Sequence, residues 1–201
     1  MSEEILINVT PRETRVAVVE NGMLQEVHLE RAAKRGYVGN IYKGRVLRVM
    51  PGMQAAFVDI GLQRAAFLHA SDIIRMLPVG AVEGEESPPP AATPPIHELV
   101  REGQDVIVQV VKDPIGSKGA RITTQLSIPS RYLVLLPYTR VLGVSVRIED
   151  EAERARLKGL LQAAMGENPL GYIVRTNAEG QAAEALVEDV AYLGKAWDAI
   201  Q

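Results

Sequence analysis

Two phenylalanines and a tyrosine fall in segments whose alternating apolar residues are typical of β-strands. Phe57 and Phe67 are the only phenylalanines among the 201 residues, and Tyr42 lies in another such segment. Under period-two alternation, each ring can face either a small core or the surface. On the surface the rings would form a platform for nucleic-acid bases, where one base stacked on one ring contributes roughly 1–3 kcal/mol. The alternation alone leaves both orientations open.

The charge distribution favours the exposed orientation. Residues 31–48 contain six Lys or Arg side chains and no Asp or Glu, and further basic residues recur beside two later strand-like segments. A basic stripe beside exposed aromatic rings is the combination that single-strand-binding proteins use. We therefore predict a nucleic-acid surface formed by Phe57, Phe67, Tyr42, Lys43, Arg45, Lys112 and Lys118.

Arg175 and Thr176 end a further apolar segment, residues 171–176, and a Gly-containing turn and a predicted helix follow them. A guanidinium and a hydroxyl at the end of a strand, near a helix N-terminus, can hold a phosphate through charge-assisted hydrogen bonds and the helix dipole. An arginine at a strand end is more often a surface residue without a ligand. The pattern by itself therefore leaves a phosphate site and a plain surface both open.

The sequence shows no pattern of a catalytic or metal-binding centre. Asp59 on a strand and Asp72 beside a short turn have sufficient structural roles, and residues 116–119 lack the spacing of a phosphate-binding loop. The three histidines follow no ligand spacing, and the chain has no cysteine. We predict neither a catalytic residue nor a metal site in this chain, and we expect structural or solvated roles for His28, His69 and His97.

The composition is that of a globular chain with room for one or two compact domains. Hydrophobic residues make up 47% of it, and the net charge of −3 argues against general adhesion to nucleic acid, so the predicted binding depends on local clustering. The absence of cysteine excludes disulfides and fits a reducing compartment. The acidic start lacks a long apolar run, so we expect no signal peptide or membrane span and a cytoplasmic location.

The aromatic and basic residues lie within a predicted small barrel of the OB type. Five short strands with turn residues between them are expected over residues 41–49, 53–60, 65–69, 105–111 and 120–124. Pro51-Gly52 should form the first turn, with the glycine free to take a positive φ. Ser71 and Asp72 should cap a helical turn over residues 73–76.

The segments around the barrel have different characters. Residues 80–96 contain three acids and five prolines and are expected to form a loop without a site. A small α/β sandwich should follow, with strands over 132–136, 144–148 and 171–176, a helix from Asp150 to about Met165, and a second from about Ala182. The apolar stripes of the two helices should be core; they comprise Leu157, Leu160 and Leu161, and Leu186, Val187, Val190, Leu193 and Trp197.

Three strands are predicted before the barrel, over residues 5–10, 14–20 and 25–29, with Asn21-Gly22 as a hairpin turn. Such a meander is too small to be stable alone, because isolated hairpins are marginal in water. The strands must either pack on the barrel or find a partner elsewhere, and the sequence does not separate these alternatives.

An ordered set of motifs resembles a known family. Residues 55–61 (AAFVDIG), the run from Phe67 to Ile73, and residues 101–104 are similar to an S1-type RNA-binding domain. Together with NIYKGRV, REGQDVIVQVVKD, GSKGARITT, SRYLVLLP and YIVRT, in this order, they resemble the ribonuclease E/G family. The leader INVTPRETRVAVVENGMLQEVHLER is more similar to the shorter branch of that family.

The resemblance implies an α+β chain of three parts. Residues 1–36 would begin an RNase H-like subdomain, residues 37–125 would be an S1-type OB-fold barrel, and residues 126–201 would be a 5′ sensor that holds the 5′-monophosphate of an RNA. By the matching motif, the phosphate site comprises Arg175, Thr176, Ser130, Val134 and Arg147. Ser130 and Val146 differ from the glycine and arginine usual in the longer branch.

The resemblance further implies a function for the longer protein. The family consists of single-strand-specific endoribonucleases that act in ribosomal RNA 5′-end maturation and messenger RNA decay. They use Mg²⁺ held by two aspartates, and they dimerise or assemble further, partly through a zinc-linking cysteine motif. Both features would lie beyond this sequence, which is expected to bind single-stranded RNA with a 5′-monophosphate and to be inactive alone. The alternatives are a non-catalytic RNA-binding adaptor and a scaffold that binds proteins through residues 186–197.

Overall fold

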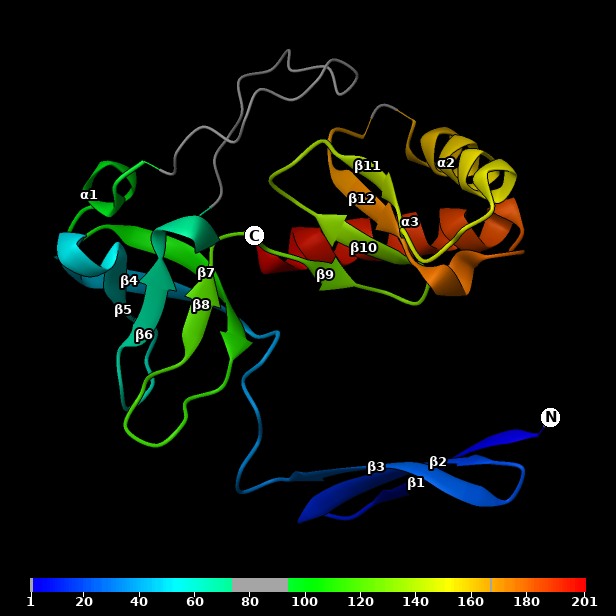
Figure 1. Cartoon of the computed structure of the whole chain (residues 1–201), viewed down its shortest axis with the longest axis horizontal. Coiled ribbons are helices and arrows are strands. Elements are labelled where there is room, and N and C mark those ends of the chain that lie inside the picture. Colours follow the sequence, from blue (N-terminus) through cyan, green and yellow to red (C-terminus); the bar gives the residue numbers. More distant parts are fainter. Residues whose placement is uncertain (1, 74–93, 167) are drawn as a thin grey trace.

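The computed structural model describes residues 2–73, 94–166 and 168–201, which form three units in chain order (Figure 1). A three-stranded sheet comes first, a closed β-barrel second, and a sheet with two helices third. The barrel and the helices place the chain in the expected α+β class. Among the described residues, no helix is long and apolar enough to cross a membrane.

The barrel consists of β4 (Ile41–Met50), β5 (Ala55–Asp59), β6 (Ala66–His69), β7 (Asp105–Lys112) and β8 (Arg121–Thr123). They close in the order β4-β5-β6-β8-β7, so the predicted five-stranded barrel is confirmed. Neighbouring strands are antiparallel except β6 and β8, which are parallel. Alternate residues point inward and are almost fully buried, among them Val46, Ala56, Val58, Ala66, Leu68, Val108, Val110 and Ile122.

A glycine permits the closure between β6 and β8. A Cβ at Gly119 would lie 1.9 Å from the carbonyl oxygen of Ala65, so no other residue fits there without moving the backbone. At this close approach the Phe67 N–H donates to the Ala120 carbonyl at 2.7 Å. The barrel therefore closes at Gly119, whose lack of a side chain lets the two backbones approach.

The connections on either side of β5 and β6 differ from the predictions. Residues Pro51–Met53 form a 3-10 turn, β5 begins at Ala55, and the left-handed residue is Gln54 (φ 49°) rather than Gly52. The turn after β6 spans Ala70–Asp72, before Ile73 rather than after it. Its cap is the imidazole of His69, which accepts from the Ser71 N–H at 3.2 Å. Residues 74–76 lie outside the described residues.

The predicted loop over 80–96 is wrong at its end. Residues 80–93 lie outside the described residues, but α1 (Ile96–Leu99) begins at Ile96. The Ile96 side chain is fully buried in the barrel core, and the Ile96 backbone N–H donates to Gln54 Oε1 at 2.9 Å. Ile96 thus contributes to barrel packing.

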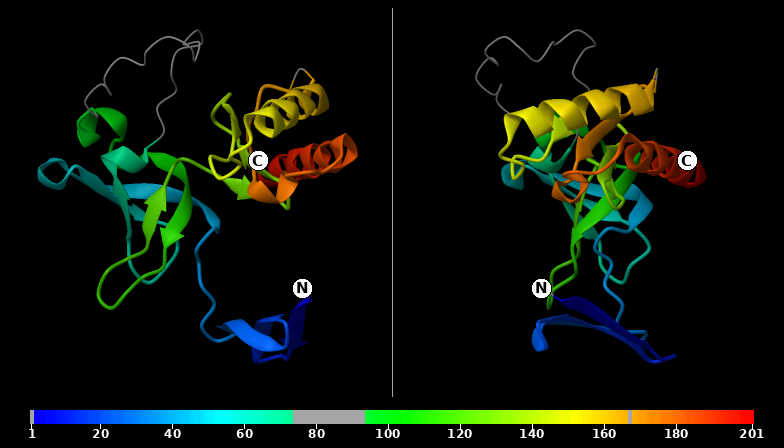
Figure 2. Two further views of the ribbon diagram at one scale, coloured as in Figure 1. Left: turned by 45° about the vertical axis from the view of Figure 1, so that its right-hand side comes forward. Right: turned by 90° about the vertical axis from the view of Figure 1, so that its right-hand side faces the viewer.

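The third unit is a four-stranded sheet with helices on one face (Figures 1 and 2). Its order is β11 (Leu142–Val144), β12 (Gly171–Val174), β10 (Leu133–Leu136) and β9 (Ile128–Pro129). Strands β11 and β12 are parallel and the other pairs antiparallel. The strand predicted over 144–148 is wrong, because the extended residues end at Val144 and a turn follows.

The helices are α2 (Glu151–Met165) and α3 (Ala183–Ile200). Asp150 caps α2 as predicted, by accepting from the Ala152 N–H at 2.9 Å. The buried residues are Leu157 and Leu161 on α2 and Leu186, Val190, Leu193 and Trp197 on α3, and burying one such leucine contributes about 1.5–3 kcal/mol. Val187 was predicted in this stripe, but it is 49% exposed and lies off it.

An acidic residue of α2 fixes the turn that precedes α3. Glu153 binds Arg156 through two hydrogen bonds and accepts from the Gly180 N–H at 2.8 Å. The Arg156 guanidinium, with the Gly180 N–H, lowers the pKa of Glu153 to about 2. The carboxylate is therefore charged at neutral pH and holds the segment after η3 (Thr176–Ala178) against α2.

The first unit is an antiparallel sheet of β1 (Glu3–Val9), β2 (Glu13–Glu20) and β3 (Met23–Arg31), in the order β1-β2-β3. Positive φ at Asn21 and Gly22 confirms the hairpin turn. Apolar side chains are exposed on both faces, such as Ile7 (66%) on one and Val27 (61%) on the other. The sheet lies apart from the barrel in Figure 1 and in the left view of Figure 2, so packing on the barrel does not complete it here.

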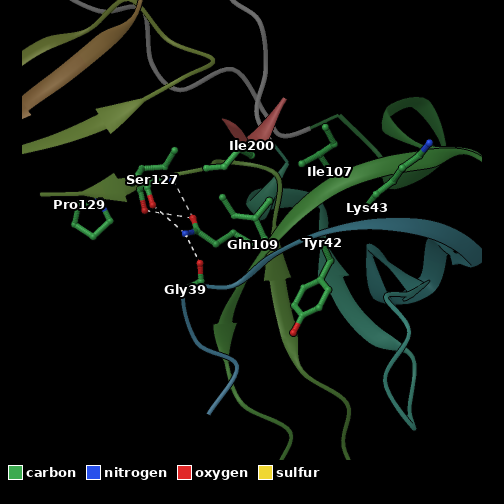
Figure 3. Close-up of a pocket in the computed structure, with 10 residues that line it drawn as sticks. Gly39, Tyr42, Lys43, Ile107, Gln109, Ser127, Pro129 and Ile200 are labelled. Carbon is green, nitrogen blue, oxygen red and sulfur yellow. Dashed lines mark hydrogen bonds between the residues drawn. The ribbon is translucent and has the colours of Figure 1, made fainter. Parts of the chain in front are cut away.

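A buried glutamine joins the barrel to the third unit (Figure 3). Gln109 on β7 donates through Nε2 to the carbonyls of Gly39 at 3.0 Å and Ser127 at 2.9 Å, and its Oε1 accepts from the Ser127 N–H at 2.9 Å. The three residues joined by these bonds line a pocket of about 510 Å³ between β4, β7 and residues 127–129. Ile200 of α3 also lines this pocket. The amide therefore fixes the start of the third unit against the barrel wall.

Candidate nucleic-acid interface

A row of aromatic and basic side chains crosses the barrel, one from each strand. The strand registers place Arg48 (β4) opposite Phe57 (β5), Phe57 opposite Phe67 (β6), Phe67 opposite Arg121 (β8), and Arg121 opposite Lys112 (β7). Directly opposed residues share one face of a sheet. We call these five residues the barrel row.

The barrel row faces outward. The residues next to Phe57, Phe67 and Arg121 along their strands point into the core and are fully buried; they include Ala56, Val58, Ala66, Leu68 and Ile122. Phe57 and Phe67 are half-buried, and their ring centroids lie 6.1 Å apart in an edge-to-face arrangement. The two rings therefore lie on the outer side of the barrel, which is the orientation that the charges favoured.

His69 extends the two rings. Its imidazole stacks beside Phe67, with centroids 6.5 Å apart and an interplanar angle of 29°. Its Nδ1 lies 2.8 Å from Ser71 Oγ, which fixes the ring orientation. The sequence alone predicts only a structural or solvated role for this histidine. The missed signal is its spacing, because a residue two positions after Phe67 on one strand must share its face.

The cations of the barrel row differ in their freedom. Asp72 binds Arg121 through two hydrogen bonds, from Nε at 2.9 Å and Nη2 at 3.2 Å, so this guanidinium is held in place beside Phe67. Within the described part of the chain, Arg48 and Lys112 form no ion pair and are exposed. These two charges at the ends of the row are available to phosphates.

The other predicted barrel residues lie outside this row. Tyr42 packs against the barrel core, because it is opposite the buried Val108. Lys43 and Arg45 both pair with Asp105, at 3.5 Å and 3.0 Å, and the Arg45 hydrogen bond lowers the pKa of Asp105. Lys118 is exposed in the turn between β7 and β8, where its N–H donates to the Ile115 carbonyl.

Four of the five residues predicted to hold a phosphate gather at one edge of the third unit's sheet. Strands β11 and β12 are parallel, so Arg147 and Arg175, which follow them, lie at the same edge. Strand β10 is antiparallel to β12, so the turn at Ser130 before β10 lies there too. Carboxyl ends of parallel strands are a common location for ligands. The edge also carries Thr176, the first residue of η3.

Arg175 is held by the turn before β10. Its Nη1 donates to the Ser130 carbonyl at 2.5 Å, and its backbone N–H donates to the Tyr132 carbonyl at 2.8 Å. The loop of Arg147 is attached to the same strand, because the Ser145 N–H donates to the Val174 carbonyl at 2.9 Å. Both arginines are exposed. We call Ser130, Arg147, Arg175 and Thr176 the phosphate edge.

Val134, the fifth predicted residue, is placed on the sheet face without helices. It lies opposite Ile173, while the neighbouring Leu133 and Leu135 point toward the helices and are fully buried. Its half-buried side chain could therefore form an apolar wall one residue inside the edge.

The acidic residues of the described chain do not gather. Among the described residues there is no group of three or more His, Cys, Asp or Glu that could hold a metal ion. Asp59 Oδ1 accepts from the Gly61 N–H at 2.9 Å, and Asp72 and Asp105 are paired with arginines. These carboxylates have structural partners.

Comparison with known proteins gives a family match for the barrel and for the third unit. Residues 37–113 match the S1 RNA binding domain, and residues 127–201 match the Ribonuclease E/G family. The chain is 58% identical to ribonuclease G of Escherichia coli (strain K12) over 98% of its length, and 56% identical to ribonuclease G of Haemophilus influenzae over 96%. It is 39% identical to ribonuclease E of Escherichia coli (strain K12) over 99%.

The higher identity to ribonuclease G agrees with the expected similarity to the shorter branch. The chain spans about 40% of the length of these ribonuclease G sequences and 18% of the ribonuclease E sequence. These matches show that the chain combines an S1 RNA-binding domain with a domain that belongs to the ribonuclease E/G family.

Proposed function

We propose that this chain supplies RNA recognition to a single-strand-specific endoribonuclease that acts in RNA processing and decay. The observation that carries the proposal is the barrel row. It places two outward-facing aromatic rings between cationic side chains on an S1 domain. Aromatic rings stack on the bases of an RNA whatever its sequence, and the flanking cationic side chains bind the backbone phosphates. Such a surface suits unpaired RNA, whose bases can leave their stack.

The phosphate edge is proposed to bind the 5′-monophosphate of the RNA. Arg175 offers a guanidinium already oriented by Ser130, Thr176 offers a hydroxyl, and Arg147 adds charge at the same edge. A terminal monophosphate presents oxygens that a guanidinium can meet in bidentate fashion, whereas a 5′-hydroxyl presents none. The chain would therefore distinguish RNA by its 5′ end as well as by its single-stranded character.

Catalysis is proposed to come from the rest of a longer protein. A Mg²⁺ centre requires carboxylates that converge on one ion, whereas Asp59 accepts from a backbone N–H and Asp72 and Asp105 each pair with an arginine. The proposed longer protein holds Mg²⁺ and a zinc link between subunits elsewhere, forms a homodimer or a larger homo-oligomer, and acts in the cytoplasm.

The first unit is proposed to be part of an RNase H-like subdomain. Its two faces expose Ile5 and Ile7 on one side and Leu6 and Val27 on the other, so a two-sided cover is required to bury it. Exposed apolar surface of this kind marks an interaction site. Residues beyond this sequence would supply the cover, since the ribonuclease G relatives are longer.

One experiment tests the division between recognition and cleavage. The purified chain, incubated with labelled single-stranded RNA and Mg²⁺, should shift the RNA in a native gel and leave its length unchanged in a denaturing gel. The physical reason is that metal-assisted hydrolysis needs fixed ligands for the ion. Asp59→Asn and Asp72→Asn serve as controls for adventitious nuclease. Mg²⁺-dependent cleavage that either substitution abolishes would contradict the proposal.

A further inference from the structure

A carboxylate on α3 reaches the turn that holds Arg175. Asp189 Oδ2 accepts from Ser130 Oγ at 2.6 Å and from the backbone N–H groups of Tyr132 at 2.7 Å and Leu133 at 3.1 Å. Three donors from four consecutive residues therefore converge on one carboxylate oxygen. Hydrogen bonds to an ionised group are stronger than neutral ones, so this oxygen is the main anchor of the turn.

The same turn contacts Arg175 from its other side. The Ser130 carbonyl accepts from Arg175 Nη1 at 2.5 Å, and the Tyr132 carbonyl accepts from the Arg175 N–H at 2.8 Å. A chain of contacts thus leads from Asp189, through the turn, to the guanidinium. Both the side chain and the backbone of Arg175 depend on where the turn lies.

We propose that Asp189 is a positioning residue for the 5′-phosphate site, which it builds by fixing the Ser130 turn against which Arg175 is oriented. The inference rests on the proposed binding of a 5′-monophosphate by the phosphate edge. A guanidinium held in place gives up less side-chain entropy when a phosphate binds than a mobile one. Asp189 acts through the turn rather than on the phosphate, because its Oδ2 accepts from three donors of the turn and a carboxylate repels an anion.

The Asp189 contacts explain why a serine suits position 130. The Ser130 hydroxyl donates to Asp189, and its oxygen also accepts from the Leu133 N–H at 3.3 Å. A residue without a side-chain donor would give the carboxylate only the two backbone N–H groups. The hydroxyl therefore adds a third bond that fixes the carbonyl of the same residue, which is the group that orients Arg175.

The test compares the preference of variants for one single-stranded RNA carrying either a 5′-monophosphate or a 5′-hydroxyl. Wild type should prefer the monophosphate by about tenfold or more. Asp189→Ala should lose most of this preference, and Asp189→Asn, which keeps one acceptor oxygen, should lose only part. Affinity for the 5′-hydroxyl RNA should stay within about twofold of wild type in both. Glu188→Gln, the exposed neighbour on α3, should behave as wild type.

A double substitution shows whether Asp189 acts through Arg175. In an Arg175→Ala background, Asp189→Ala should cause no further loss of preference, because the group that it positions is gone. A role in stability alone would lower the melting temperature without changing the ratio of the two affinities. If Asp189→Ala fails to fold, the Asp189→Asn measurement decides.

The outcomes separate this inference from the proposed function. A folded Asp189→Ala or Asp189→Asn variant that keeps the full wild-type preference, while Arg175→Ala abolishes it, would overturn the positioning role and leave the phosphate site intact. Equal affinity of wild type for the two RNA ends would overturn both. Loss of preference in Asp189→Ala that adds to the loss in Arg175→Ala would show that Asp189 acts by another route, against the inference.

Discussion

Replacing Phe57 or Phe67 by alanine should weaken the binding of single-stranded RNA by ~5- to 150-fold, since one base stacked on one ring contributes ~1–3 kcal/mol. Both rings are half-buried and face outward, with centroids 6.1 Å apart, so a base can lie against either. The measurement is the affinity of each variant for a fluorescent oligonucleotide with a 5′-hydroxyl, which leaves the phosphate edge without a ligand.

Two controls separate stacking from other effects of these substitutions. Phe57→Leu and Phe67→Leu keep apolar volume but lose the flat ring, so they should bind as weakly as the alanine variants. Tyr192→Ala removes an exposed ring from α3, far along the chain from the barrel, and should bind as wild type. Leucine variants that bind like wild type would show that the rings only pack, which contradicts the stacking role.

Replacing Arg175 by alanine should remove a preference of tenfold or more for monophosphorylated RNA, because a charge-assisted hydrogen bond contributes about 1.5–3 kcal/mol. Binding through the barrel should persist, since none of its row depends on the RNA terminus. The affinities of wild type and variant are measured for one oligonucleotide carrying either end, at low salt.

The chain offers a matched control for Arg175. Arg140 is also exposed, but it precedes β11 and therefore lies at the opposite edge of the same sheet. Arg140→Ala removes the same charge and should retain the preference. An equal loss in both variants would mean that general positive charge, rather than the phosphate edge, recognises the RNA end.

The sequence predicted the strands of the barrel better than the ring orientation. Alternation and turn residues were sufficient for five strands, but alternation alone allowed Phe57 and Phe67 to face either way, and only the basic clusters favoured the outward orientation. The position of Phe67 beside Arg121 follows from the pairing of β6 with β8, two strands separated by more than fifty residues. Long-range pairing of this kind leaves no local signal.

The barrel row was only partly predictable for the same reason. Phe57, Phe67 and Lys112 were expected, whereas Arg48 and Arg121 were noticed only as part of the basic clusters. Each joins the row because its strand neighbour is an aromatic or basic residue contributed by another segment. Tyr42 has the same local pattern as the phenylalanines, but its strand pairs it with a core valine.

The misplaced elements share a tertiary cause. Ile96 follows two prolines and was assigned to a loop, yet the open end of the barrel core buries it and a helix forms there. The strand predicted over 144–148 lies at 142–144, because only these residues pair with β12. Helices α2 and α3, in contrast, were placed almost to the residue by Asp150 and by their apolar stripes, which are local signals.

The central claim is that this chain recognises RNA as a single strand, and one comparison of affinities tests it most directly. The purified chain is titrated against a labelled RNA and against the duplex of the same sequence, over a series of salt concentrations. We predict tighter binding to the single strand at every salt concentration, because duplex bases stack on one another and present no free face to Phe57 and Phe67. Equal or tighter binding to the duplex would contradict the account.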